Sequence, residues 1–432
     1  MTYVLFFFLL IIVLLAYKRF GLANITIIGV VPLIVELLVA NAYQKEWSFY
    51  PNLDTVIIVT LGLLGFLLGE ILSSKKIKVK SLGNPNFTVV KKNKLIVLFF
   101  IQLFSYVLFA RSLMSAMGGN LLVAIAKYNI QTKVEGVSVP FPVGVGPLYF
   151  MSLKISIICS ALLALYYVKK VKTSKFWLWI NFIIGLLASM MMGGRIMLLT
   201  SLVSFAFSYT FFLKAFLVNS ATKLKGVILK FGLVFIVFGI SFSLLGGILG
   251  HEESESKDSE QESIAYNFAV YCGAPLKNLD TFVKSHYSSN CSLPGEYTFS
   301  YLWSNLLKKG RDRSKLLEFE YENGYVLGNV KTAFLYPYYD GGFVFVFFSF
   351  LFSGILSGYI LRKSVKKMKF LNAGFVDFWS ILLFALVGRV AFFFFDDCLW
   401  PWFFKLFDFH DFTYIILILV YLYGFKNFKK II

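Results

Sequence analysis

Charged residues are scarce in this sequence. Only 15% of its 432 residues are charged, whereas 58% are hydrophobic and 19% are aromatic. Soluble domains average about 25% charged residues, so the composition argues against a water-soluble fold. Phenylalanine and leucine occur in long uninterrupted runs, and a bilayer core of about 30 Å needs roughly 20 apolar residues per helix. The composition therefore predicts an all-α polytopic integral membrane protein.

The usual signatures of nucleotide and metal sites are also missing. The sequence contains no GxxxxGK[ST], no GxGxxG, no HExxH and no Asp-rich metal cluster, which are patterns that hold phosphates and metal ions. Transport driven by ATP hydrolysis within this chain is therefore not expected, and neither is a metal or another cofactor. The four cysteines show no CxxC spacing. Cys272 and Cys291 share one predicted outer loop, where they either form a disulfide or stay free.

Apolar runs divide the sequence into about eleven predicted membrane spans within a single membrane domain, 1–432. We place the spans at 2–17, 22–40, 53–72, 95–115, 147–168, 176–192, 196–213, 228–248, 342–361, 374–396 and 411–425. Lys18-Arg19, and no small-residue cleavage site, follows the first run, so we expect a span and not a removable signal peptide. A single helix over 176–213 would be about 57 Å long, so we expect Gly193-Gly194 to separate two spans.

Basic residues alternate strictly from one connection to the next. Six alternate connections, counting the C-terminus, hold lysines and arginines and no Asp or Glu, whereas the intervening ones hold most of the acidic residues. Lysine and arginine mark the cytoplasmic ends of spans. We therefore expect the N-terminus outside, the C-terminus inside and a large external loop between spans 8 and 9. The same rule accounts for the net charge of +19, which would suggest nucleic acid only in a soluble chain.

The large external loop covers residues 249–341. It begins with the acidic stretch HEESESKDSEQES and continues with a segment rich in tyrosine, phenylalanine and tryptophan, interleaved with basic residues. We expect this aromatic part to form a partly helical cap on the membrane surface, with a short interfacial helix in FSYLWSNLLKK at 299–309.

Four basic residues lie in the outer half of the predicted spans, where charge is costly. They are Arg111, Lys154, Arg195 and Arg389. Each could reach the outer headgroups by itself, and Arg195 could simply cap the hairpin after the glycine pair. One shared anionic ligand would explain all four. A diphosphate fits, because guanidinium groups bind phosphate oxygens in bidentate fashion.

Several possible general bases are predicted on the same outer side. Asp340 stands in YPYYDGG, where the large loop re-enters the membrane, and Asp396-Asp397 ends the tenth span. The histidines are His251, His286 and His410. A carboxylate or imidazole beside basic residues can act as a general base. The alternative is that the histidines are surface residues and that the aspartates lie at a solvated helix end.

Two short motifs carry a resemblance to a known family. Gly193-Gly194-Arg195, at the outer start of a predicted span, is similar to a small-small-Arg turn, and GNVKTAFLYPYYDGG from Gly328 resembles an Asn-x-x-Thr, then Tyr-x-Asp-x-Gly, pattern. Both are found in Wzy-type oligosaccharide repeat-unit polymerases, which build bacterial O-antigen and capsule, and the plan of spans and loops is similar over the whole chain. Lys331 stands where this family has an aromatic residue, and Gly341 where phenylalanine is common. The matching positions are Asn329, Thr332, Tyr338, Asp340 and Gly342.

The resemblance implies an integral-membrane glycosyltransferase of the bacterial cytoplasmic (inner) membrane. Such an enzyme takes a growing glycan from an undecaprenyl (polyprenyl) diphosphate and transfers it to the acceptor sugar of a new lipid-linked repeat unit, without a nucleotide sugar. Asp340, or alternatively His286, would take the proton of the acceptor hydroxyl, and Arg195 would stabilise the leaving diphosphate. The residues expected to contact the substrate are Arg111, Lys154, Arg389, Asn329, Lys331, Thr332 and Tyr338.

Two other classes of protein handle the same lipid-linked glycan. A flippase or transporter would also need interior cations, but it would be expected to have short loops on both sides and charges through the whole membrane depth. An O-antigen ligase-like transferase would use the same donor with a different acceptor. The expected partners are the polyprenyl-diphosphate-linked oligosaccharide, membrane lipids, a chain-length regulator and a flippase, and no nucleic acid.

Overall fold

The computed structural model describes the chain in segments that form two compact units. The described residues are 1–21, 24–73, 89–129, 131–132, 139–192, 195–216, 264–285, 291, 293–300, 303, 319–370 and 409–424. The first unit comprises residues 1–78, 256–363 and 387–407, and the second comprises 79–255, 364–386 and 408–432. Each unit has its own core, and most of the described residues in both are helical.

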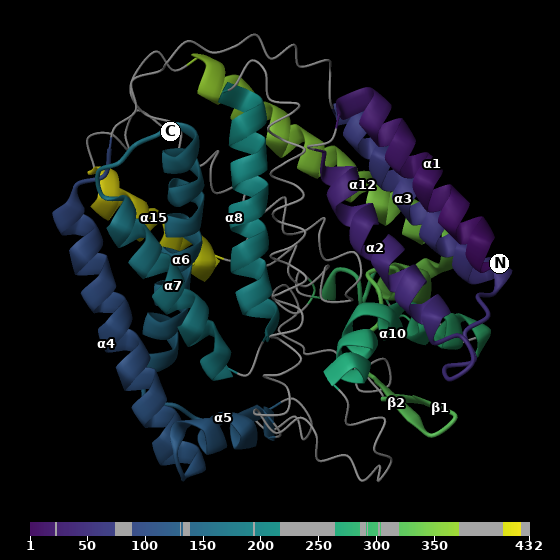
Figure 1. Ribbon diagram of the computed structural model, residues 1–432, viewed down its shortest axis with the longest axis horizontal. Coiled ribbons are helices and arrows are strands. Elements are labelled where there is room, and N and C mark those ends of the chain that lie inside the picture. The colour runs from purple at the N-terminus through teal and green to yellow at the C-terminus, as the bar shows by residue number, and fades with distance from the viewer. Residues whose placement is uncertain are drawn as a thin grey trace. The chain divides into compact units, whose positions relative to one another are not determined.

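The first unit contains helices from the start of the chain and from its second half (Figure 1). Its elements are α1 (Thr2–Phe20), α2 (Ile25–Ala42), α3 (Leu53–Ser73), α10 (Ile264–Lys284), β1 (Glu320–Glu322), β2 (Tyr325–Gly328) and α12, which begins in this unit and spans Leu335–Phe370. The two strands pair antiparallel. Asn323 (φ 50°) and Gly324 (φ 84°) form the turn between them, and these positive φ values are typical of a two-residue hairpin.

Helices α3 and α12 approach each other closely through small residues. A Cβ atom at Gly69 would meet the backbone of Leu351, and one at Gly354 would meet the backbone carbonyl of Phe66. Small residues let two membrane helices bring their backbones together, which maximises van der Waals contact where lipid supplies no hydrophobic driving force. The sequence of these helices therefore specifies their contact through glycine.

A buried carboxylate fixes α2 against α3. Glu70 accepts hydrogen bonds from the side-chain amide of Asn24 (2.9 Å) and the hydroxyl of Thr26 (2.7 Å), and all three residues are buried. The side-chain oxygen of Asn24 also accepts a bond from the backbone N–H of Ile27 at the N-terminus of α2. A polar group inside an apolar bundle is costly unless it is hydrogen-bonded, and here the bonds join two spans.

The second unit is a helical bundle around α6. Its elements are α4 (Lys92–Met117), α5 (Leu121–Asn129), α6 (Val145–Val168), α7 (Lys175–Ser189), the 3₁₀ turn η2 (Met190–Met192), α8 (Arg195–Phe216) and α15 (Phe409–Tyr423). Helix α6 contacts α4, α7, α8 and α15, and from Ile155 to Tyr166 every residue is buried. Figure 1 shows the short α5 lying across the end of α4.

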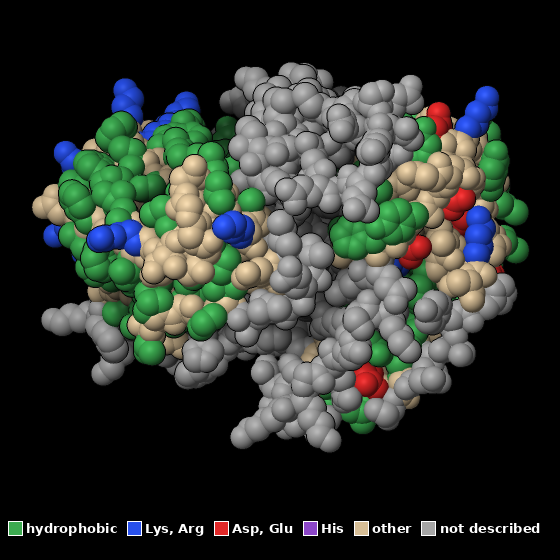
Figure 2. Space-filling model, turned by 90° about the horizontal axis from the view of Figure 1, so that it is seen from below, with side chains coloured by type: hydrophobic (Ala, Val, Ile, Leu, Met, Phe, Trp, Pro, Cys, Tyr) green, Lys and Arg blue, Asp and Glu red, His purple; other side chains and the backbone are tan. Residues whose placement is uncertain are grey.

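Six described helices are long and apolar enough to cross a membrane. They are Thr2–Phe20, Ile25–Ala42, Leu53–Ser73, Lys92–Met117, Val145–Val168 and Leu335–Ile360. Shorter apolar helices are Lys175–Ser189, Ser201–Leu213 and Thr413–Tyr423. Large apolar side chains such as Phe7 and Phe104 are exposed on the outside of these helices, and Figure 2 shows hydrophobic side chains over the described surface of both units. The chain is a multi-pass helical membrane protein.

Most predicted spans coincide with helices. The run at 176–213 divides into α7 and α8, so the prediction of two helices there is confirmed. The predicted span 342–361 belongs to a longer helix, α12, which starts seven residues earlier and is interrupted at Gly341 and Gly342. The runs 228–248 and 374–396 and the acidic stretch 251–263 lie outside the described residues. The span number and the orientation of the termini stay predictions.

Candidate functional site

The backbone breaks at the point where the large loop leads into the membrane helix. Within α12, Gly341 (φ −170°, ψ 26°) and Gly342 (φ 64°, ψ −154°) have non-helical conformations. The combination at Gly342 is one that essentially only glycine adopts. The helical segment beginning at Leu335 therefore ends at Asp340, and the membrane-crossing helix starts beyond the glycine pair. This gives a physical reason for glycine at position 342.

Asp340, the last residue before this break, is held by residues that lie more than 40 positions earlier in the sequence. Its Oδ1 accepts a hydrogen bond from the backbone N–H of Tyr297 (3.0 Å), and its Oδ2 accepts one from that of Thr298 (2.7 Å). The thiol of Cys291 also donates to Oδ1, over 3.4 Å. These bonds fasten the segment 291–300 to the start of the membrane helix.

The surroundings of Asp340 are aromatic. The ring of Tyr339 meets the ring of Tyr297 edge-on, with 4.9 Å between centroids, and lies 6.0 Å from that of Phe282 on α10. Burial raises the pKa of the Tyr297 phenol, and nearby Tyr339, Cys291, Glu296 and Asp340 raise it further. The phenol therefore stays protonated at neutral pH and remains a hydrogen-bond donor beside the carboxylate.

The hydrogen bonds of Asp340 determine which reactions its carboxylate can take part in. An ionised carboxylate offers about four lone-pair positions, and three of them are used here by Tyr297, Thr298 and Cys291. The two backbone N–H groups belong to a helical turn in which Phe299 N–H donates to the Gly295 carbonyl, so Asp340 also caps that turn. The side chain is half-buried. It is therefore a fixed, partly accessible carboxylate that can anchor the loop and can accept a proton.

The residues that precede Asp340 in the resembling motif are packed inside the first unit. Thr332 is fully buried, and its carbonyl accepts the N–H of Leu335. Lys331 is 1% exposed, and its ammonium group forms an ion pair with Glu320 on β1 at 3.2 Å. Asn329 and Tyr338 are half-buried. Lys331 thus has an internal partner for its charge, and its contact with a substrate stays a prediction.

Polar residues of helix α10 hold the chain that leads to Asp340. The sequence alone did not identify them. The side-chain amide of Asn278 donates to the carbonyls of Leu327 (3.2 Å), Gly328 (3.4 Å) and Val330 (2.9 Å). Asn278 is fully buried, so these bonds hold the end of β2 and the start of the motif. A mixture of Lys, Asn and Asp within an aromatic-rich loop gives no sign of which of them are buried, so the sequence offered no clear signal.

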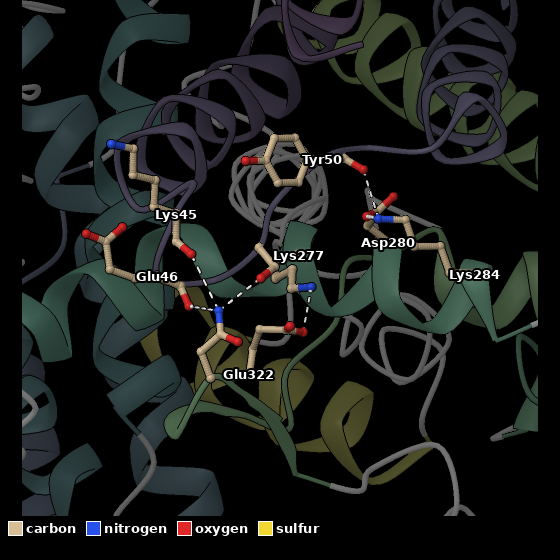
Figure 3. A network of polar contacts seen from close by, with 9 residues as sticks. Lys45, Glu46, Tyr50, Lys277, Asp280, Lys284 and Glu322 are labelled. Carbon is tan, nitrogen blue, oxygen red and sulfur yellow. Dashed lines mark hydrogen bonds and ion pairs between the residues drawn. The ribbon is translucent and has the colours of Figure 1, made fainter.

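A second set of contacts from α10 reaches the hairpin and α2–α3 (Figure 3). The buried Lys277 forms an ion pair with Glu322 on β1 at 3.0 Å. Lys284 donates to the carbonyl of Tyr50 (2.8 Å) and pairs with Asp280 (2.6 Å). At the tip of the hairpin, the side-chain amide of Asn323 donates to the carbonyl of Glu46 (3.0 Å). Within the first unit, these contacts hold α10 and the hairpin against each other and against residues 45–50.

The predicted basic residues are described only in part. Arg111 is exposed on α4, and Lys154 is half-buried on α6, both in the second unit. Arg195 is the first residue of α8, and its side chain is not described. Arg389 and His286 lie outside the described residues. Their gathering around one anionic ligand stays a prediction.

The remaining reactive groups to consider are the cysteines and possible metal ligands. Cys159, Cys272 and Cys291 are free thiols, so the alternative of a disulfide between Cys272 and Cys291 is not observed. No group of three or more His, Cys, Asp or Glu side chains that could hold a metal ion occurs among the residues that the structure describes.

Comparison of the chain with models of protein families, with curated proteins and with solved structures gives no match. The class of the protein is therefore defined by its apolar helices alone, as a multi-pass helical membrane protein.

Proposed function

We propose that this protein polymerises lipid-linked oligosaccharide repeat units at the outer face of a bacterial cytoplasmic membrane. It would transfer the growing glycan from polyprenyl diphosphate to the acceptor sugar of a new repeat unit. The observation that supports the proposal is that three hydrogen bonds fix Asp340 directly before the backbone break in α12. In this proposal, the lipid-linked donor and the sugar acceptor meet beside this carboxylate.

In the proposed reaction, Asp340 acts as the general base. A hydroxyl oxygen of the acceptor sugar forms a bond to the anomeric carbon of the donor glycan, and its proton passes to the carboxylate of Asp340. The bond between that carbon and the diphosphate oxygen breaks, so the lipid diphosphate leaves. The sequence-based prediction assigns the stabilisation of the negative charge that develops on it to Arg111, Lys154, Arg195 and Arg389. No nucleotide sugar is needed.

The bonds to Asp340 support its role by limiting its motion. A general base must lie within about 3 Å of the proton that it removes, and a carboxylate with free rotation would spend little time in one position. The backbone N–H groups of Tyr297 and Thr298 hold one oxygen each. The aromatic rings around it, including those of Tyr297 and Tyr339, are suited to packing against sugar faces.

The test is complementation of a deletion strain, with the surface glycan resolved by gel electrophoresis. Wild type restores the long-chain ladder, whereas Asp340→Asn and Arg195→Ala should leave a core that carries a single repeat. Glu46→Gln, a neutralised acid in the same unit, serves as the matched control and should restore the ladder. Membrane insertion of each variant is measured in parallel.

The same experiment separates the other two classes of protein. Loss of all repeats on deletion, with lipid-linked units accumulating outside, would indicate a ligase, and accumulation inside would indicate a flippase. A full ladder from the Asp340→Asn variant would refute the role of this carboxylate, and an unchanged ladder in the deletion strain would refute a role in glycan assembly.

A further inference from the structure

Lysines from two separate segments meet at one end of the second unit. One segment leads into α4 and contains Lys91, Lys92 and Lys94; the other joins α6 to α7 and contains Lys169, Lys170, Lys172 and Lys175. Val90 connects them, because its N–H donates to the hydroxyl of Tyr166 (2.8 Å) and its carbonyl accepts a bond from the hydroxyl of Ser174 (2.9 Å). Neither segment contains an acidic residue.

Lys94 and Lys175 interact with neighbouring residues of the unit. The ammonium group of Lys94 donates to the carbonyls of Tyr421 (2.7 Å) and Leu422 (2.9 Å) at the end of α15, where the helix dipole is negative. The ammonium group of Lys175 lies 3.2 Å from the ring centroid of Tyr167. Among the described residues, the four exposed lysines have no acidic partner. These four, which we call the basic surface, are Lys91, Lys92, Lys170 and Lys172.

Lys170 has a backbone conformation that normally selects glycine. Its φ is 55°, and it ends α6 in a Schellman turn, with the Val171 N–H bonded to the Tyr166 carbonyl at 2.9 Å and the Lys170 N–H to that of Tyr167 at 3.3 Å. Glycine is the usual residue at this position because it has no Cβ to clash. A positively charged residue therefore occupies a position at which glycine would have less backbone strain.

Two helices also begin beside the basic surface, and both begin without a cap. Neither α4 nor α7 has an acidic residue in its first turn, and neither Lys91 nor Ser174 caps its helix with a side-chain hydrogen bond. The hydroxyl of Ser174 instead donates a hydrogen bond to the backbone carbonyl of Val90. Uncapped N–H groups and the positive end of the helix dipole favour an anion, and lysines in the same place strengthen that preference.

The flank of the basic surface is apolar. Phe176, directly after Lys175, is 67% exposed, and close by the indole of Trp179 donates to the hydroxyl of Tyr167 (3.0 Å). Aromatic residues beside lysines are typical of the boundary between hydrocarbon and headgroups. An anion bound here would therefore have an apolar surface next to it, which fits the acyl chains of a lipid better than free phosphate or nucleic acid.

We propose that Lys91, Lys92, Lys170 and Lys172 bind the phosphate-bearing headgroups of anionic phospholipids in the leaflet that this end of the unit faces. Acyl chains of the bound lipid would pack along Phe176. The site does not depend on the proposed glycosyltransferase activity, because it is built from other residues and binds a lipid that is not a substrate.

The test is native mass spectrometry of the full-length protein in detergent, titrated with phosphatidylglycerol or with phosphatidylcholine of the same chain length. The wild type should bind phosphatidylglycerol more tightly, and high salt should reduce the difference. Each lysine near an anionic surface changes affinity by about fivefold, so Lys170→Gln with Lys172→Gln should weaken phosphatidylglycerol binding on the order of tenfold or more. The matched control, Lys45→Gln with Lys127→Gln, removes the same charge elsewhere and should have little effect.

A second variant separates binding from folding. Lys170→Gly removes the charge and relieves the backbone strain, so it should weaken phosphatidylglycerol binding while leaving the thermal unfolding temperature unchanged or higher. Equal binding of the two lipids by the wild type would overturn the proposal. So would unchanged binding by the double variant, an equal loss in the control, or displacement of the lipid by millimolar inorganic phosphate. A failed glycan test would leave this result untouched.

Discussion

The hydroxyl of Thr55, at the start of α3, donates a hydrogen bond of 2.7 Å to the Asp280 carboxylate on α10, 225 residues later in the chain. The same carboxylate oxygen accepts the backbone N–H of Asn52 at 2.7 Å, and the other oxygen pairs with Lys284. Asp280 is fully buried. One carboxylate therefore satisfies the N-terminus of α3 and attaches α10 to it.

Replacement of Asp280 by alanine should destabilise the docking of α10. Removing the acceptor leaves the N–H of Asn52 and the hydroxyl of Thr55 without their partner, and hydrogen bonds to a charged group contribute about 1.5–3 kcal/mol. We expect a loss of about 3 kcal/mol in the free energy of unfolding, measured by denaturation in mixed detergent micelles, and faster proteolysis of the chain around α10.

Thr55→Val is a milder variant of the same contact, to be compared with Asp280→Ala. It removes one of the hydrogen bonds to Asp280 and leaves the bond from Asn52 and the Lys284 pair, so the expected loss is about 1.5 kcal/mol. If Asp280→Ala were no more destabilising than Thr55→Val, the carboxylate would not be the link between the two elements.

The buried ion pair between Lys331 and Glu320 gives the second prediction. Lys331→Met should cost about 2–3 kcal/mol, below the range for a fully buried pair, because the side chain of Glu320 is 24% exposed. Lys331→Met combined with Glu320→Gln should recover at least half of that loss, since no unpaired charge then remains. Denaturation in micelles measures both, and Lys45→Met is the exposed-lysine control.

The same pair of variants separates a structural role for Lys331 from binding of the substrate. If the lysine serves only to pair with Glu320, the double variant should restore the glycan ladder as well as stability. A double variant that is stable but makes no long-chain glycan would show that the positive charge itself contacts the substrate.

The helices could be predicted from the sequence because they depend on a strong local signal. Apolar runs bounded by lysines define α1, α3 and α6 to within a few residues. The division between α7 and α8 was also predicted, since one helix over that length would exceed the membrane thickness and Gly193-Gly194 is a natural break. Local composition therefore determines these helices, whereas α5 and α10 lie outside the predicted spans.

The geometry around the candidate site could not be predicted in the same way. The sequence identified Asp340 by its motif, but not its bonds to Tyr297 and Thr298, which depend on how the loop folds back. The sequence also did not indicate that Lys331 would be buried against Glu320, or that Asn278 would hold the start of the motif. Such contacts join residues that lie far apart in the sequence, and the hydrophobic periodicity of the sequence does not predict them.

Gly342 supplies the third prediction. Its φ of 64° with ψ of −154° lies in a region open essentially to glycine, and a residue forced into such a conformation costs about 1–3 kcal/mol. Gly342→Ala should therefore lower stability by about that amount and should reduce glycan synthesis by moving Asp340. Gly146→Ala is the control, because it also meets open space but has an ordinary φ. Equal stability of the two variants would contradict strain at position 342.

The thiol of Cys272 gives a prediction that depends on pH. Burial on α10, with a smaller contribution from the nearby Glu36 charge, raises the pKa of this thiol from 9.0 to about 12. Because the thiolate is the reactive form, alkylation of Cys272 in the folded protein at pH 8 should be on the order of a thousand times slower than that of a free cysteine. Peptide mass spectrometry after iodoacetamide treatment measures the rate, and the denatured chain is the control.

The pKa of Cys272 also fixes the sign of its effect on stability. Between about pH 9 and 12 the unfolded chain loses this proton while the folded protein keeps it, so the unfolded state binds fewer protons and stability falls as the pH rises. Cys272→Ala removes this contribution, and its stability should therefore decline less steeply than that of the wild type over this range. Rapid alkylation of the folded protein at pH 8, or identical pH profiles for the two proteins, would show that the thiol is not buried beside Glu36.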